Sequence, residues 1–219
     1  MTKLGTAPNS KLLKMRTGDI LFLLLLVFSQ TLSAAETVRK ISPEAVSQGP
    51  LKLSADETIS RDRGRIIDAS GHVKVNYDME NGDTLESVSQ FAKYDHGEGL
   101  GEVWGNPDAL WKRKDPKEPA TRLLAQKIIL KIKDSELLAT GNVSVIRSSS
   151  TLRAEKISYS NGEQKMTALG GQPEFTIRET NHHTRIRAQK IVAWTEKKEI
   201  HFSDHVKGVV LLKEEPKPE

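Results

Sequence analysis

The amino-acid sequence predicts an all-β fold, a V-shaped or twisted β-jellyroll of two apposed antiparallel sheets built from about five repeats. A short pattern recurs five times, and four of its copies place a glycine at the same position. Within each copy apolar and polar residues alternate, which is the period of a half-buried strand. Beyond residue 35 no long segment has the period of a helix, and turn residues separate the candidate strands.

Each repeat begins at a small residue and reaches its glycine sixteen residues later. The opening residues are Ala55, Ser89, Ala125, Ala154 and Ala188, and the positions sixteen residues on are Gly71, Gly105, Gly141, Gly170 and Asp204. The spacing from one repeat to the next varies, with steps of 34, 36, 29 and 34 residues. A fixed internal offset with variable spacing predicts one structural unit joined by loops of different length.

Each repeat is predicted to contain a strand, a tight turn and a returning strand. Alternating Ile128, Leu130 and Ile132 mark the first strand of the third repeat, and Asn161-Gly162 is a hairpin signal in the fourth. The repeated glycine, such as Gly141, lies on the apolar face of the returning strand. Glycine weakens a strand unless a bend requires it, so we predict a corner at which each strand passes from one sheet to the other.

The two ends of the chain are predicted to lie outside this domain, which covers residues 51–212. Residues 1–35 predict a signal peptide, because basic residues precede the apolar run Ile20 to Phe28 and small residues follow it. That run is short for a bilayer span, which needs about 20 residues, so we expect cleavage; the alternative is an uncleaved membrane anchor. Residues 36–50 are predicted to be a lead-in, with one helical turn over residues 42–48 as an option, and residues 213–219 a disordered tail.

Composition excludes several classes of function. The net charge of +4 becomes +1 without residues 1–35, which hold four of the 33 basic and one of the 29 acidic residues. The basic character therefore belongs to the leader, and we expect no nucleic-acid binding. The chain has no cysteine, which excludes disulfides and thiol chemistry. No catalytic, nucleotide or metal motif stands out, so we expect neither an enzyme nor a cofactor nor a metal site.

Two segments show the repeat most clearly, namely "AQKIILKIKDSELLATGNVSVIR" (Ala125 to Arg147) and "TLRAEKISYSNGEQKMTALGG" (Thr151 to Gly171), and Thr184 to Trp194 repeats their opening. In these segments the chain resembles the LptA/OstA family of periplasmic lipopolysaccharide-transport proteins, over about residues 51–212. The inner-membrane-anchored LptC and the N-terminal domain of LptD share this fold. The pattern therefore indicates the fold family well and separates its members less well.

The resemblance implies an OstA-like jellyroll that is open along one side. Its apolar groove would shield the acyl chains of lipopolysaccharide (lipid A), and its members would stack end to end through exposed terminal strands. It further implies LptC-like and LptD-like partners, a periplasmic location, and no catalytic residues, cofactor or metal. The charged segment Trp111 to Arg122 departs from the repeat and is expected to be an outer loop. The alternatives are an LptC-like relay anchored in the inner membrane and a structural β-repeat protein that binds no lipid.

Ten inward-facing apolar residues form the candidate lipid-binding groove: Ile128, Leu130, Ile132, Val143, Val145, Ile157, Tyr159, Phe175, Ile177 and Ile191. Covering hydrocarbon is worth about 0.8 kcal/mol per CH₂ group, which is the physical reason for such a groove. The alternative for each residue is packing in a sealed core. Five basic residues either meet lipid phosphates at the groove mouth or face solvent as ordinary strand positions: Arg153, Arg185, Arg187, Lys190 and Lys207.

Overall fold

The computed structural model describes residues 39–41, 46–48, 51–79, 81–180 and 182–212. All of them belong to the compact unit Glu36–Glu219. The predicted signal peptide, much of the lead-in and the predicted tail lie outside the described residues.

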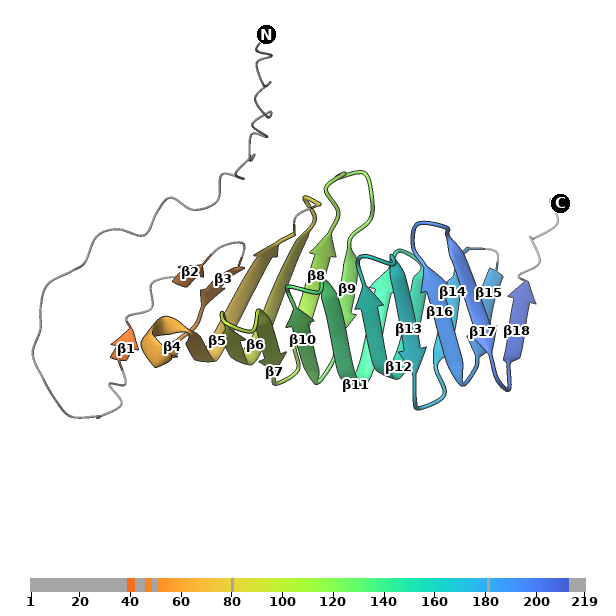
Figure 1. Ribbon diagram of the computed structural model, residues 1–219. Coiled ribbons are helices and arrows are strands. Elements are labelled where there is room, and N and C mark those ends of the chain that lie inside the picture. The colour runs from red at the N-terminus through yellow and green to blue at the C-terminus, as the bar shows by residue number, and fades with distance from the viewer. Residues whose placement is uncertain (1–38, 42–45, 49–50, 80, 181, 213–219) are drawn as a thin grey trace, which may run out of the picture. The chain divides into compact units, whose positions relative to one another are not determined.

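The described residues form eighteen β-strands and one short 3₁₀ helix, η1. Most strands are short and follow one another through tight turns (Figure 1). Their bounds are β1 (Arg39–Ile41), β2 (Val46–Gln48), β3 (Leu51–Ser54), β4 (Glu57–Arg61), η1 (Asp62–Gly64), β5 (Ile66–Asp78), β6 (Thr84–Asp95), β7 (Leu100–Trp104), β8 (Asp108–Lys112), β9 (Thr121–Leu124), β10 (Lys127–Lys131), β11 (Glu136–Arg147), β12 (Ser150–Ser160), β13 (Lys165–Leu169), β14 (Glu174–Arg178), β15 (His182–Arg187), β16 (Lys190–Trp194), β17 (Glu199–Ser203) and β18 (Lys207–Leu212).

Strand pairing defines two antiparallel sheets that share four long strands. The first sheet has the order β1-β4-β5-β6-β7-β10-β11-β12-β13-β16-β17, and the second has the order β2-β3-β5-β6-β8-β9-β11-β12-β14-β15-β18. The strands β5, β6, β11 and β12 belong to both sheets, one half of each strand to each sheet. The predicted fold class, a twisted jellyroll of two apposed antiparallel sheets, is therefore confirmed.

The repeated glycine forms the corner between the sheets. The pairing of β5 with β6 shifts register between Ser70 and Val73, and that of β11 with β12 shifts between Thr140 and Val143. The five corner residues have left-handed backbone, with φ of 71° at Gly71, 82° at Gly105, 79° at Gly141, 75° at Gly170 and 62° at Asp204. The predicted corner is confirmed, and the aspartate of the fifth repeat adopts the same conformation as the glycines.

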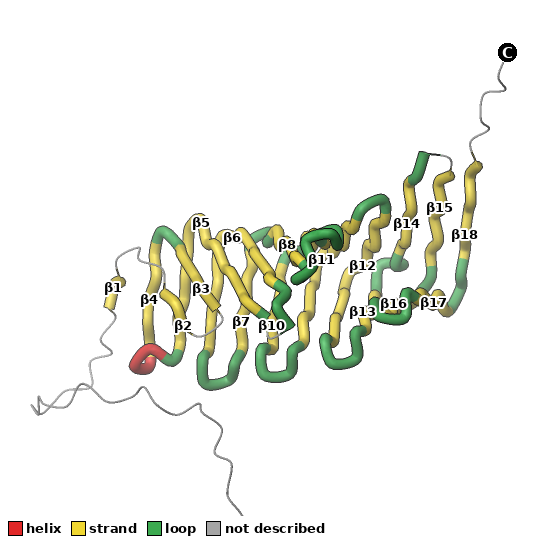
Figure 2. The backbone as a smooth tube through the Cα atoms, turned by 90° about the horizontal axis from the view of Figure 1, so that it is seen from above, coloured by secondary structure: helices red, strands yellow, loops and turns green. Residues whose placement is uncertain are grey.

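A second set of hydrogen bonds ties each repeat to the next through the turns of the first sheet. The first residue of a turn donates its N–H to the last residue of the preceding turn. These bonds join His96 to Arg65 (2.9 Å), Ile132 to Gly99 (2.8 Å), Asn161 to Ser135 (3.0 Å) and Thr195 to Gln164 (2.9 Å). The turns therefore stack in a regular file, visible as green loops along one side in Figure 2.

The connections of the second sheet differ in length, which explains the variable spacing between repeats. The longest described one joins β8 to β9 and spans residues 113–120. The predicted outer loop is therefore shorter than Trp111 to Arg122, because Trp111 and Lys112 end β8 and Thr121 and Arg122 begin β9. The optional helical turn over residues 42–48 is wrong where it is described, because Val46–Gln48 pairs with Leu51–Leu53 as a strand.

Replacing Gly141 with alanine is expected to destabilise the fold by about 1–3 kcal/mol, the usual cost of a non-glycine residue in strained backbone. Its φ is +79°, and an added Cβ would lie 2.7 Å from the Cβ of Gln126. Urea denaturation measures the free energy of unfolding. Gly162→Ala is the control, because an added Cβ there meets nothing within 4 Å. Equal effects of the two changes would contradict the assigned role of the corner.

Candidate functional site

The space between the two sheets is lined by regular rows of inward side chains. Cross-strand pairing of the first sheet places one row next to the corner and a second row nearer the turns, the mouth row. The corner row runs Val103, Ile128, Ala139, Ile157, Ala168, Ile191 and Phe202, and the mouth row runs Tyr94, Gly101, Leu130, Leu137, Tyr159, Met166, Ala193 and Ile200. From Ile128 to Ile191 the corner row alternates between isoleucine and alanine.

Nine of the ten predicted groove residues belong to the core or pack against it, to different depths, and Ile177 lies on the same face of β14 as Phe175. Six are buried in the core: Ile128, Leu130, Val143, Ile157, Tyr159 and Ile191. Four are only half-buried and lie at the edge of the core: Ile132, Val145, Phe175 and Ile177. The second group therefore presents more apolar surface to a molecule that enters from outside.

The mouth row becomes more accessible toward the C-terminal end. Tyr94, Leu130 and Leu137 are 7–8% exposed, whereas Ile200 at the far end of the row is 37% exposed. Met166 and Ala193 between them are half-buried. The interior is therefore tightly packed at its centre and open at the end formed by β17 and β18.

A cavity of about 310 Å³ lies between the two sheets on the side opposite the corner, which we call the open side. It is lined by Tyr77, Asp78, Met79, Trp111, Leu130, Lys131, Ile132, Lys133, Ser135, Glu136, Leu137, Tyr159 and Asn161. Small-molecule pockets in proteins have volumes of roughly 300–1,000 Å³. The cavity is therefore large enough for a small apolar ligand.

One aromatic contact crosses the open side and joins the two sheets. The ring of Trp111 in β8 of the second sheet packs edge-on against the ring of Tyr159 in β12 of the first, with centroids 4.7 Å apart. The guanidinium of Arg113 lies 5.4 Å from the Trp111 ring centre. We call this contact the crossing.

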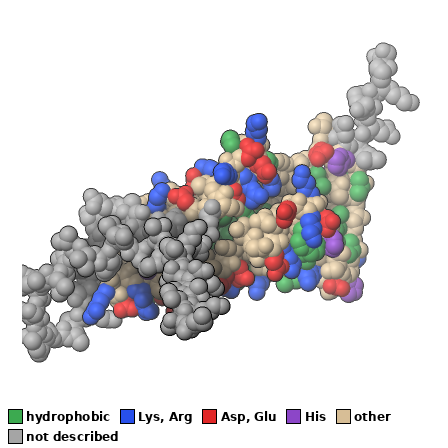
Figure 3. All heavy atoms as spheres, turned by 45° about the horizontal axis from the view of Figure 1, so that its top comes forward, with side chains coloured by type: hydrophobic (Ala, Val, Ile, Leu, Met, Phe, Trp, Pro, Cys, Tyr) green, Lys and Arg blue, Asp and Glu red, His purple; other side chains and the backbone are tan. Residues whose placement is uncertain are grey.

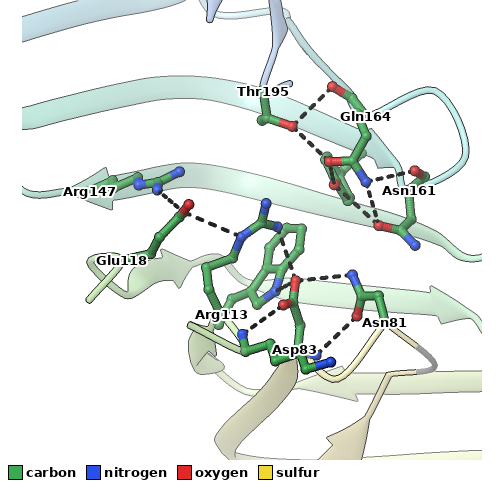
Figure 4. A network of polar contacts seen from close by, with 11 residues as sticks. Asn81, Asp83, Arg113, Glu118, Arg147, Asn161, Gln164 and Thr195 are labelled. Carbon is green, nitrogen blue, oxygen red and sulfur yellow. Dashed lines mark hydrogen bonds and ion pairs between the residues drawn. The ribbon is translucent and has the colours of Figure 1, made fainter. Parts of the chain in front are cut away.

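A buried carboxylate holds the crossing in place. Asp83 is 4% exposed and accepts hydrogen bonds from the Trp111 indole N–H, the Arg113 guanidinium and the Lys114 backbone N–H, each at 3.0 Å. The Asn81 amide donates a fourth at 3.2 Å. Figure 4 shows these groups converging on the carboxylate. A buried charge with this many partners is stable only while the partners stay in place.

The other half of the crossing is fixed by amide and hydroxyl groups. The Tyr159 hydroxyl donates to Gln164 Oε1 at 3.1 Å, and the Thr195 hydroxyl donates to the same oxygen at 3.0 Å. Gln164 Nε2 donates to Asn161 at 2.9 Å. Burial raises the pKa of the Tyr159 hydroxyl, an effect that Thr195 and Arg113 only partly offset. The tyrosine therefore remains a neutral hydrogen-bond donor at physiological pH.

Three of the five predicted basic residues lie on the outer face of the second sheet, around one carboxylate. Arg187 Nε donates to Glu174 at 2.7 Å, and Arg185 and Arg153 lie 3.8 and 4.0 Å from it. Burial by itself would raise the pKa of Glu174, but the hydrogen bond from Arg187 and the two further charges lower it below its ordinary value. These arginines alternate with inward Leu152 and Ile186 and so face away from the interior.

The C-terminal end of the unit exposes apolar side chains on a strand with one free edge. β18 pairs with β15 on one side, and no described strand pairs with its other side. Figure 3 shows hydrophobic side chains at this end, among charged ones. The exposed large apolar residues here are Ile200, Val206, Val209, Val210 and Leu211, and the last three are 56–61% exposed.

The described residues include no helix long and apolar enough to cross a membrane. Within the same part of the chain, no group of three or more His, Cys, Asp or Glu side chains is arranged to hold a metal ion.

Comparison with known proteins identifies the fold. No protein-family model matches the chain, and no curated protein matches its sequence. Among solved structures, the chain is similar to LptH, the LptA-homologous periplasmic component of the lipopolysaccharide transport device from Pseudomonas aeruginosa, with a TM-score of 0.52 and 15% sequence identity. The similarity covers 59% of this chain and 96% of that chain. At this identity the match shows an LptA-like jellyroll fold alone.

Several residues at the cavity and the crossing were not predicted from the sequence. Met79, Trp111, Asp83 and Arg113 were not among the candidate residues, and neither was Tyr77. Trp111 lies on the same face of β8 as the buried Ala109, which indicates an inward position. The charged residues that follow it led to the prediction of an outer loop instead. Asp83 lies beside the Asn81-Gly82 turn and gives no pattern of its own.

Replacing Asp83 with alanine is expected to lower the free energy of unfolding by about 3 kcal/mol, because it leaves the half-buried Arg113 charge and the Trp111 N–H without this acceptor. Urea denaturation followed by tryptophan fluorescence measures the loss. Asp134→Ala, in an exposed turn, serves as the control and should change stability by less than about 0.5 kcal/mol. A similarly small effect at Asp83 would show that the crossing does not depend on this carboxylate.

Proposed function

We propose that this protein is a periplasmic lipopolysaccharide carrier, which shields acyl chains between its two sheets and bridges the inner and outer membranes by stacking end to end. The observation that supports it best is the interior of the jellyroll. It is apolar throughout the corner row, and it presents half-buried apolar side chains at the mouth. The likeness to LptH supports the same pathway, since that protein is a periplasmic component of lipopolysaccharide transport.

The physical basis is the cost of exposing hydrocarbon to water. A lipid with several acyl chains gains about 0.8 kcal/mol for each CH₂ group that it buries. Four of the predicted groove residues, Ile132, Val145, Phe175 and Ile177, are half-buried and can provide such cover without unfolding the core. Of the six buried residues, Leu130 and Tyr159 border the cavity, and the other four would contact lipid only if the sheets separate.

The sheet edges supply the means of assembly. An unpaired edge presents a row of free N–H and C=O groups, which another strand can satisfy by extending the sheet. In the described part of the chain, β18 has such an edge and exposed apolar side chains. Self-association and docking to LptC-like and LptD-like components would use these terminal strands, with no catalytic step, cofactor or metal in this chain.

Two alternative functions follow from specific features. An LptC-like relay would retain residues 1–35 as a membrane anchor, and the mass of the mature N-terminus separates it from a cleaved carrier. A structural repeat protein that binds no lipid would have a sealed interior, and the burial of the corner row is consistent with that alternative. Lipid labelling of the half-buried residues separates this second alternative from a carrier.

A photoreactive amino acid at Ile132 or Ile177 is expected to crosslink to lipopolysaccharide in cells, because both side chains are apolar and accessible at the mouth. The fully buried Ile157 is a poor probe position, since a bulky side chain there would disturb the core. Lys156 is the control, because it lies beside Ile157 in β12 and is exposed on the outer face of that strand. Gel mobility and immunodetection of the lipid reveal the adduct. Absence of labelling at both mouth positions in folded protein would exclude the carrier function.

Replacing both Val209 and Leu211 with lysine is expected to weaken self-association, because charge on a free edge strand opposes strand addition. Sedimentation velocity across a concentration series measures the shift toward monomer. Val88→Lys is the matched control: Val88 is also 50% exposed, but its strand is paired on both sides. Equal association of all three proteins would show that β18 is not the assembly edge.

A further inference from the structure

We infer that the cavity beside the crossing is a discrete binding site for one linear hydrocarbon chain of an amphiphile. The inference rests on the proposed function and refines it, since the chain would be one acyl chain of the transported lipid. It differs from a continuous groove in that the site ends at the contact between Trp111 and Tyr159. One hydrocarbon chain is therefore held separately from the others.

Both sheets contribute apolar side chains to the lining of the cavity. The second sheet contributes Tyr77, Met79 and Trp111, and the first sheet contributes Leu130, Ile132, Leu137 and Tyr159. Four of these, Tyr77, Met79, Trp111 and Ile132, are half-buried and pack against the core while keeping surface on the cavity. These side chains favour contact with hydrocarbon.

The rim of the cavity does not select a particular head group. Lys131 and Glu136 pair with each other at 2.9 Å, and Asp78 pairs with Lys52 at 3.2 Å. The Lys133 ammonium donates to the carbonyl of Gly97. Because these rim charges already have partners, recognition must come from the apolar chain. The polar end of the ligand would remain among them in water.

The crossing closes the site on its C-terminal side. Beyond Trp111 the mouth row of the second sheet becomes polar, passing through Thr121, Arg147 and Ser150 before the next apolar residue, Ile177. Arg147 donates to Glu118 at 2.8 Å, and Glu118 also lies 3.7 Å from Arg113. Figure 4 shows this polar group beside the crossing. A hydrocarbon chain therefore meets a charged barrier at this point and cannot continue along the mouth.

Trp111 reports directly on occupancy of the site. The chain has three tryptophans, and replacing Trp104 and Trp194 with phenylalanine leaves Trp111 as the single emitter. Trp104 stacks on Phe91 and Trp194 lies against His201, so neither belongs to the cavity lining. The probe is dibromostearate, whose bromines quench a tryptophan that they touch, with unbrominated stearate as the reference.

We expect dibromostearate to quench Trp111 saturably, below the concentration at which it forms micelles, and stearate to compete for the same site. Ile132→Lys, which places a charge in the lining, should weaken this binding by about tenfold or more, the equivalent of 1.4 kcal/mol. Leu169→Lys is the matched control, because Leu169 is 40% exposed and lies outside the cavity lining. Circular dichroism and urea denaturation establish that each variant is folded.

Three results would overturn the inference: no saturable quenching, equal weakening by both lysine substitutions, or weakening by neither. Lipopolysaccharide crosslinking at Ile177, on the far side of the crossing, is measured in the same protein, with Trp104 and Trp194 replaced by phenylalanine. If crosslinking persists while Trp111 is not quenched, the single-chain site is wrong and the carrier function stands. If Trp111 is quenched but no lipopolysaccharide is captured, the site binds hydrocarbon and the carrier function fails.

Discussion

The corner between the sheets is the constraint on which the structure depends. At this point a residue with left-handed backbone ends each returning strand of the first sheet. In the first, third, fourth and fifth repeats the residue after the opening position donates its N–H back across the corner, as from Asp56 to Gly71 at 2.9 Å and from Gln189 to Asp204 at 2.9 Å. An ordinary L-residue disfavours this conformation. The glycine is therefore repeated because the bend is repeated, and the distance of sixteen residues is the length of one hairpin of the first sheet.

At the corner the two sheets are joined by strands that run from one into the other. On the opposite side no backbone connects them within the described residues. The two sheets meet there through side chains alone, and the exposure of the interior depends on how closely they approach. The contact between Trp111 and Tyr159, held by the buried Asp83, closes the centre. On both sides of this contact apolar residues retain accessible surface, with Met79 on one side and Phe175 on the other. In the proposed function, this incomplete closure allows hydrocarbon to enter while the stacked turns keep the sheets aligned.

The sequence contains the information for the strands and the corner because both are local. Alternation identifies the inward face of each strand, and all ten predicted groove residues do face the interior. Their depth is not predictable from alternation, since Ile157 and Ile177 have the same pattern and only the second has accessible surface. The crossing was missed because it joins residues 48 positions apart in different sheets. The second-sheet connections that bring Trp111 to Tyr159 vary in length and follow no repeat, so no periodicity reports this contact.

The central claim is that the interior binds the acyl chains of lipopolysaccharide. The most direct test is isothermal titration of the purified protein with lipopolysaccharide and with the same lipopolysaccharide after complete deacylation. We expect removal of the chains to weaken binding by about a hundredfold or more, because the hydrocarbon supplies most of the binding free energy. Equal affinity for both forms would mean that the sugar or phosphate groups are recognised instead, and would contradict the assignment of the interior as a lipid groove.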